Sequence, residues 1–187
     1  MIKIVEYNSE SSTELIKKLE HRSQFENEPI LITVREILAD VRETGDNAVI
    51  KYTRKFDAPD MSPHNLQVTE QEIDLAYSEV EEEFLEAINL AKSNIESFHQ
   101  KQLRNSWITT ETNGTILGHL VRPLRRVGVC VPSVSQLLVS SLIMNVVPAK
   151  VAGVEEVAVF MGPKPDGTID PHMLVTAAEC GTREIYK

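Results

Sequence analysis

Cysteine, aromatic side chains and long apolar runs are all scarce in this chain of 187 residues. Its two cysteines, Cys130 and Cys180, both stand among apolar neighbours, so we expect buried free thiols in a reducing compartment rather than a disulfide. No apolar stretch is long enough to span a membrane, and the first residues do not read as a secretory signal. We therefore expect a cytoplasmic protein with no membrane partner.

Positive charge is also in short supply, since 19 lysines and arginines face 28 carboxylates and leave a net charge of −9. This balance argues against nucleic acid as a partner. Metal-binding and catalytic motifs are missing as well. No two histidines stand three or four residues apart, none accompanies a pair of cysteine ligands, and no Ser-His-Asp set, P-loop or GxGxxG is legible. We assign no catalytic residue and no metal ligand. The five histidines are His21, His64, His99, His119 and His172.

Helical spacing of apolar residues predicts a helical N-terminal region over residues 1–105, after a short edge strand at residues 1–7. Thr69–Glu72 and Ser78–Glu81 both have capping-box spacing, and the second should open the longest helix. The glutamates at the start of that helix fit a solvated N-terminus better than an acidic binding face. The earlier helices are expected over residues 11–22, then after a lead-in at residues 29–33 through about residue 44, and over residues 46–56.

Residues 106–187 read differently. Two short strands around Asn113-Gly114 predict a β-hairpin with a type I′ turn. A Val-rich strand from Arg126 to Val131 then leads, through a turn opened by Pro132, into an apolar helix that stops at Gly153. Ser133 and Ser135 are its possible caps. A second strand at 156–161, a helix after Asp170-Pro171 that ends at Gly181, and a third strand at 183–187 follow. The predicted fold class is α/β: a helical N-terminal region and a β-hairpin, followed by half of a Rossmann-like β-α-β-α-β unit.

Two stretches of that unit carry a resemblance to a known family. Arg126-Val-Gly-Val-Cys-Val-Pro132 and Ser140-Ser-Leu-Ile-Met-Asn-Val-Val-Pro-Ala-Lys-Val-Ala-Gly-Val154 resemble the histidinol dehydrogenases, whose pattern there is roughly VGxYVPGGxAxYPSSVLMNxxPAKVAGV. The segments 34–49 and 52–57, with Asp166–Asp170 and Glu184–Lys187, also fit. The resemblance covers most of this chain but only the first part of the family's length. It implies an NAD- and zinc-dependent oxidation of L-histidinol to L-histidine, and a dimeric protein.

The sequence departs from the family where the resemblance places the NAD contact. Cys130 replaces a tyrosine, Ser133 and Val134 replace the glycine pair, and Leu138 and Val139 replace a tyrosine-proline. A side chain at a glycine position hinders the close approach of a ligand to the backbone. We therefore expect weak or no NAD binding at this turn.

The candidate cofactor-binding residues carried over from the family pattern are Pro132, Ser140, Ser141 and Asn145. Ser140, Ser141 and Asn145 have an alternative, structural role. The two serines would hydrogen-bond within the helix, and Asn145 would tie a loop to the end of the helix.

Five nearby residues are expected to have no functional role. Lys150 is expected to be solvated, and Cys130 to be an inert buried residue. Arg122, Arg125 and Arg126 should pair with glutamates rather than hold a phosphate.

The resemblance implies that the zinc ligands and the acid–base pair lie later in the family's sequence, so we expect this chain alone to be inactive and to carry no cofactor. Three interpretations stay open: one half of a split enzyme, a degenerate paralogue acting as a binding or interaction protein, or an incomplete gene product without a selected role. An open edge and an uncovered apolar face of the short sheet predict a homodimer. Whether the altered turn accepts a small-molecule ligand is undetermined by the sequence.

Overall fold

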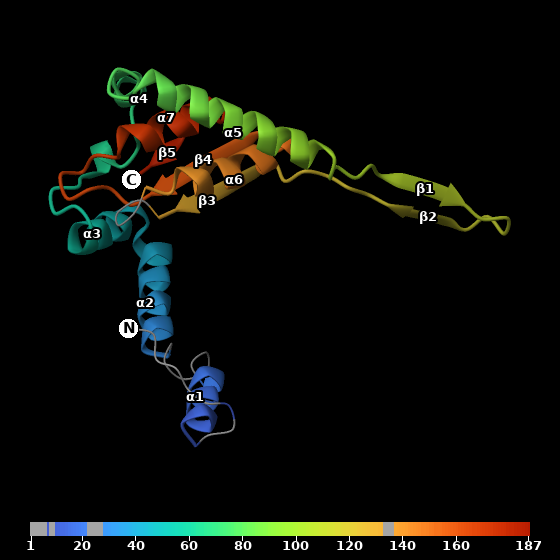
Figure 1. The fold of residues 1–187 in the computed structure, drawn as a ribbon, viewed down its shortest axis with the longest axis horizontal. Helices are drawn as coiled ribbons and strands as arrows, with labels where there is room; N and C mark the ends of the chain where they lie inside the picture. Colours follow the sequence, from blue (N-terminus) through green and yellow to red (C-terminus); the bar gives the residue numbers. More distant parts are fainter. Residues whose placement is uncertain (1–6, 8–9, 22–27, 133–136) are drawn as a thin grey trace. The chain divides into compact units, whose positions relative to one another are not determined.

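The fold was analysed in a computed structural model that describes residue 7 and residues 10–21, 28–132 and 137–187 (Figure 1). Residues 1–49 and 50–187 form two compact units. In the described residues, no helix combines the length and the apolar character needed to cross a bilayer. Helices α4 (Glu70–Ala76) and α5 (Glu82–Gln100) belong to the same compact unit as the sheet, and the division at residues 105/106 stays a prediction.

The first unit is helical, as its apolar spacing predicts. It contains α1 (Glu10–His21) and α2 (Glu28–Thr44), and α2 has no buried residue. Gly45, at φ +59°, ends α2 in a conformation that costs glycine little. Helix α3 (Asp46–Phe56) starts directly after it and continues into the second unit. The strand predicted for residues 1–7 lies outside the described residues, apart from Tyr7.

Two capping-box predictions have different outcomes. Thr69 caps α4 (Glu70–Ala76): its hydroxyl accepts from the Glu72 amide at 3.2 Å, and the Glu72 carboxylate accepts from the Thr69 amide at 2.8 Å. Ser78, in contrast, donates its hydroxyl to the Leu75 carbonyl at 2.7 Å and so closes α4. The long helix α5 (Glu82–Gln100) therefore begins later than predicted, with Glu81 at its N-cap. A short 3-10 turn, η1 (Pro63–Asn65), precedes α4.

The hairpin forms where predicted, with a different turn. Strands β1 (Trp107–Thr110) and β2 (Ile116–His119) pair antiparallel. The Glu111 amide bonds to the Thr115 carbonyl at 2.8 Å, and the Gly114 amide to the Glu111 carbonyl at 3.0 Å. Gly114 has φ +83°. This pattern is typical of a three-residue loop that ends on a left-handed glycine, so the two-residue type I′ prediction was wrong.

Three parallel strands, in the order β3-β4-β5, form the main sheet, and Val129, Val159 and Ile185 lie side by side in it. The strands are β3 (Arg126–Val131), β4 (Glu156–Met161) and β5 (Ile185–Tyr186), joined by α6 (Val139–Val151) and α7 (Pro171–Glu179). Asp170 caps α7, as predicted, by accepting from the His172 amide at 3.1 Å. The half Rossmann-like unit is thus confirmed.

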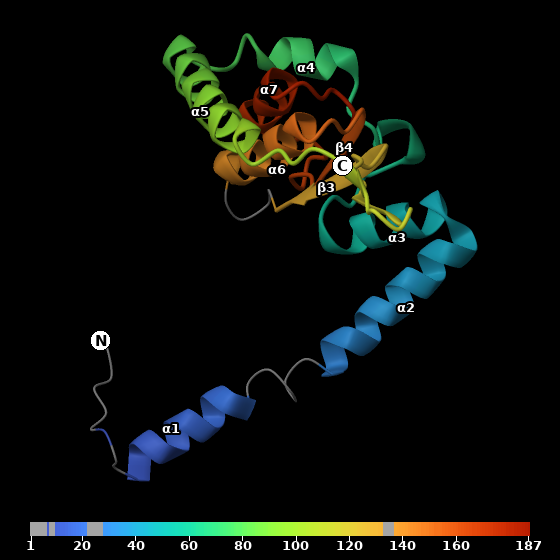
Figure 2. The same cartoon turned by 90° about the vertical axis from the view of Figure 1, so that its right-hand side faces the viewer.

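Both crossover helices cover the same face of the sheet, and α4 and α5 pack over these helices as an outer layer (Figure 2). The core lies between the sheet and α6 and α7. Its fully buried members, each at most 1% exposed, include Val131, Leu142, Val146, Val159, Met173, Val175 and Ile185. Such one-sided cover follows from successive right-handed crossovers in one direction.

Candidate functional site

The predicted cofactor site falls between the end of β3 and the start of α6, at the carboxyl edge of the sheet, where doubly wound folds bind ligands. Pro132, Ser140 and Asn145 are exposed there, and Ser141 is half-buried. The Asn145 side chain donates to the Ser141 carbonyl at 2.7 Å, one helical turn back. Asn145 thus bonds within α6 instead of tying a loop to its end.

The turn itself, residues 133–136, lies outside the described residues. The predicted caps Ser133 and Ser135, and the departures from the family's glycine pair at Ser133 and Val134, therefore stay predictions. In the described part, Leu138 occupies the N-cap position of α6 and offers no polar group to its first amides.

Metal chemistry finds no support among the described residues, which contain no group of three or more histidine, cysteine or carboxylate side chains placed to hold an ion. The described residues therefore do not fit zinc.

One histidine nonetheless has a defined polar setting. His172 Nδ1 lies 3.0 Å from Asp170 Oδ1, and its Nε2 lies 3.3 Å from Glu81 Oε2. Partial burial lowers the pKa of His172, but the two carboxylates outweigh it and leave the pKa above its usual value. No catalytic or metal-binding motif includes His172, but its position two residues after the N-cap aspartate Asp170 is a sequence signal of this contact.

The two cysteines differ. Cys180 is buried, and burial raises the pKa of its thiol to about 11, so it is unreactive at neutral pH. Cys130 is exposed, which corrects the prediction that both thiols are buried. The reason is that Cys130 points to the face of the sheet that α6 and α7 leave uncovered.

Two of the three clustered arginines, Arg125 and Arg126, pair with glutamates as predicted. Arg126 contacts Glu156 at 2.8 Å and also bonds to Glu184, while Arg125 lies 3.4 Å from Glu156. These pairs hold the amino ends of β3, β4 and the segment before β5 together. Arg125 and Arg126 therefore hold neighbouring strands together, and Glu156 and Glu184 neutralise their charge.

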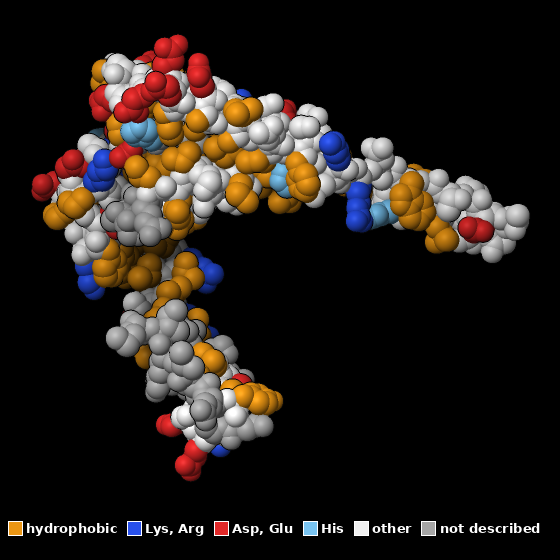
Figure 3. Space-filling view, viewed as in Figure 1, with side chains coloured by type: hydrophobic (Ala, Val, Ile, Leu, Met, Phe, Trp, Pro, Cys, Tyr) orange, Lys and Arg blue, Asp and Glu red, His pale blue; other side chains and the backbone are white. Residues whose placement is uncertain are grey.

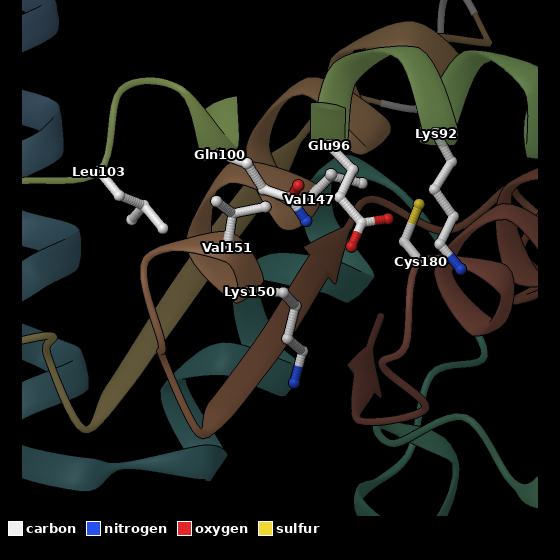
Figure 4. Close-up of a pocket in the computed structure, with 8 residues that line it drawn as sticks. All are labelled: Lys92, Glu96, Gln100, Leu103, Val147, Lys150, Val151 and Cys180. Atoms are coloured by element: carbon white, nitrogen blue, oxygen red, sulfur yellow. The ribbon is translucent and has the colours of Figure 1, made fainter. Parts of the chain in front are cut away.

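A hollow of about 560 Å³ lies at the other, amino edge of the sheet, among the last turns of α5, α6 and α7 (Figure 4). Lys92 Nζ donates to the Glu179 carbonyl at 2.5 Å, and Lys150 Nζ to the Glu155 carbonyl at 3.2 Å. Cations at helix C-terminal ends stabilise the carbonyls there. Lys150 is thus bonded to the backbone, where the sequence predicted a solvated side chain. The hollow is lined by Lys92, Glu96, Gln100, Leu103, Val147, Lys150, Val151 and Cys180.

A β-α-β-α-β unit with a three-stranded parallel sheet and its crossover helices on one face is half of a Rossmann-like α/β fold. Comparison with known proteins then specifies the family. The family model of histidinol dehydrogenase matches residues 20–187, so the chain belongs to the histidinol dehydrogenase family.

Individual histidinol dehydrogenases are also similar to this chain. A histidinol dehydrogenase from Clostridium acetobutylicum is 42% identical over all of this chain and 43% of its own length. One from Moorella thermoacetica is 46% identical over 86% of this chain and 38% of its own length. The crystal structure of histidinol dehydrogenase from Elizabethkingia anophelis matches with a TM-score of 0.76 and 34% identity, covering 87% of this chain and 36% of that chain. The chain spans less than half the length of these relatives.

Proposed function

We propose that this chain supplies the N-terminal part of a histidinol dehydrogenase, an enzyme that oxidises L-histidinol to L-histidine with NAD, and that it is inactive by itself. The observation that carries the proposal is the full-length match to less than half of each curated relative. The proposed location is the cytoplasm.

The test is an assay with a complementary polypeptide. The purified chain, given L-histidinol, NAD and zinc, should form no NADH. Adding the part of the Clostridium acetobutylicum relative that this chain does not match should restore turnover. NADH formation by the chain alone would contradict its inactivity, and failure of the added part would favour the alternative below.

Cofactor affinity forms a separate part of the proposal. We propose that NAD binds weakly or not at all to this chain, because Ser133 and Val134 stand where the family has glycines. The candidate contacts are Pro132, Ser140, Ser141 and Asn145. Calorimetric titration with NAD should give no heat of binding, and micromolar affinity would contradict this proposal.

The altered turn also favours a second candidate, a degenerate paralogue that acts as a binding or interaction protein. A divided enzyme is expected to keep the family's turn residues, and this chain does not. Restoring Ser133→Gly and Val134→Gly distinguishes the two candidates. Recovered NAD binding together with turnover in the complemented mixture favours the divided enzyme, whereas no recovery favours the paralogue.

We further propose that the chain forms a homodimer, and the hairpin supports this. Every residue of β1 and β2 is exposed, including Trp107, Ile108, Ile116 and Leu117. Hydrophobic side chains gather along it (Figure 3). An isolated two-stranded hairpin is marginally stable in water, so these side chains need a surface to pack against. A second copy of the chain is the proposed surface.

A further inference from the structure

The hollow at the amino edge of the sheet lies away from the candidate cofactor residues, which are at the carboxyl edge. Three helices end around it: α5 contributes Glu96 and Gln100, α6 contributes Val147 and Val151, and α7 contributes its C-cap, Cys180. The volume of the hollow, about 560 Å³, is within the range of small-molecule sites in proteins. The hollow is therefore large enough for a ligand of metabolite size.

The floor of the hollow is apolar. Val147 and Cys180 line it although each is only 4% exposed, so the hollow reaches down to side chains of the core. Val151 continues this surface one helical turn further along α6, and Leu103, which is 55% exposed, extends it beyond the end of α5. An aliphatic group of a ligand would shield these side chains from water, which is favourable.

A carboxylate points into the same hollow. Glu96 lies on α5 one helical turn after Lys92, and Figure 4 shows its carboxylate directed into the space between the lining side chains. Glu96 is half-buried, and within the described part of the chain its side chain makes no hydrogen bond or ion pair. A partly buried carboxylate of this kind is available to a hydrogen-bond donor of a ligand.

Two ammonium groups border the hollow as well. Lys92 and Lys150 are both half-buried, and each donates to a backbone carbonyl, that of Glu179 and that of Glu155 respectively. These bonds position the two lysines at the helix ends. Because an ammonium has three N–H groups, donors are left for a ligand. The lysines thus provide local positive charge on a protein whose net charge is −9.

The mixed charge of the lining selects the class of ligand. A simple anion would be repelled by Glu96, and a simple cation would be repelled by Lys92 and Lys150. A zwitterion satisfies both signs, because its ammonium pairs with the glutamate and its carboxylate with a lysine. Side chains one helical turn apart have Cβ atoms about 5–6 Å apart, so one amino-acid head group can bridge Glu96 and Lys92.

We propose that the hollow binds a free α-amino acid with an aliphatic side chain. Its ammonium pairs with Glu96, its carboxylate pairs with Lys92 and Lys150, and its side chain packs on Val147 and Val151. The proposal does not depend on the proposed enzymatic function, because the hollow contains none of the candidate cofactor residues.

L-leucine is the probe for this site, together with two derivatives that each lack one charge. N-acetyl-L-leucine has no ammonium, and L-leucinamide has no carboxylate. In a titration of the isotope-labelled chain followed by NMR, L-leucine should bind with a dissociation constant of about 1 mM or lower and shift the amide signals of Val147 and Cys180. Each derivative should bind about tenfold more weakly, because one charge-assisted hydrogen bond is lost. No binding of L-leucine, shifts confined to other segments, or equal affinity for either derivative overturns the proposal.

A pair of variants on α5 locates the site. Glu96→Gln keeps the size of the side chain and removes its charge, so it should weaken L-leucine about tenfold and bring its affinity close to that of N-acetyl-L-leucine. Glu86→Gln, at an exposed position of the same helix, is the matched control and should leave both affinities unchanged. A merely structural effect of Glu96→Gln would weaken both ligands alike. That result, or equal effects of the two variants, overturns the proposal.

Discussion

His172 illustrates how a single side chain joins two helices. Its ring bridges Asp170, the N-cap of α7, and Glu81, the N-cap of α5, and packs edge-on against Phe84 with centroids 4.6 Å apart. Lys164 also contacts Asp170, at 2.9 Å. Protonated His172 thus pairs with two carboxylates at the point where both helices begin.

This arrangement predicts a pH dependence of stability. The pKa of His172 is raised in the folded state, so its contribution is complete below the unfolded value of about 6.5 and is lost as pH rises through the folded pKa. The free energy of unfolding, measured in urea, should therefore fall as the pH rises above about 6.5. The step should be about 1 kcal/mol or less, because the pair is partly solvated.

His172→Gln should remove this step, since glutamine does not titrate. His64→Gln changes an exposed histidine and should leave the step in place. A step of unchanged size in His172→Gln would show that another group causes it.

Asp170 has a second role that can be separated from its charge. It accepts the His172 amide and caps α7, so Asp170→Ala should lower the free energy of unfolding by about 1–2 kcal/mol. Asp170→Asn keeps a side-chain acceptor and should cost less. Urea unfolding of the wild type, Asp170→Ala and Asp170→Asn at pH 7 measures both changes. An equal loss of unfolding free energy in the two variants would show that the ion pair with Lys164 matters more than the cap.

At the scale of elements, α6 shows what packing contributes. Leu142 is fully buried against the sheet, whereas Met144, on the same helix, is 62% exposed. Leu142→Ala should therefore cost about 2–5 kcal/mol, through lost burial and the cavity it leaves. Met144→Ala should change the free energy of unfolding by less than about 0.5 kcal/mol. Thermal unfolding of both variants tests this, and similar losses would contradict the burial of Leu142.

Elements were predicted well where one local signal acted alone. Strand β4 matches its predicted bounds, because an apolar run between Gly153 and a Pro- and Gly-rich loop has no competing interpretation. The start of α5 was wrong because Ser78-Glu-Val-Glu81 had capping-box spacing while Ser78 bonded to the preceding helix instead. The hairpin loop likewise differs by one residue, since Asn113-Gly114 suits two kinds of turn.

At the scale of the molecule, the proposed homodimer depends on the exposed apolar side chains of the hairpin. Ile108 and Ile116 are 76% and 68% exposed. If two copies pack through the hairpin, replacing both isoleucines with serine should convert a dimer to a monomer. Glu111→Ala, in the hairpin loop, is the control and should not. Light scattering at micromolar concentration measures the mass, and a wild-type monomer would contradict the proposal.

The candidate cofactor site was only partly predictable. The family pattern places Pro132, Ser140, Ser141 and Asn145 at the carboxyl edge of the sheet, and Pro132 and the first turn of α6 lie there. No sequence signal revealed that Asn145 bonds back to Ser141, because a short amide side chain on a helix can bond within the helix or beyond it. Lys92 was equally hidden, since its partner carbonyl at Glu179 lies on a distant segment.

The sequence by itself determined the family and the order of helices and strands, because motifs, periodicity and turn residues act over a few positions. The tertiary structure alone decided that Cys130 is exposed, that His172 joins two helices, and that the outer edge of β5 is occupied. These depend on which distant segments meet: α6 and α7 cover one face, and the stretch around Gln67 occupies the edge of β5. Local propensity carries no information about which distant segments of the chain pack together.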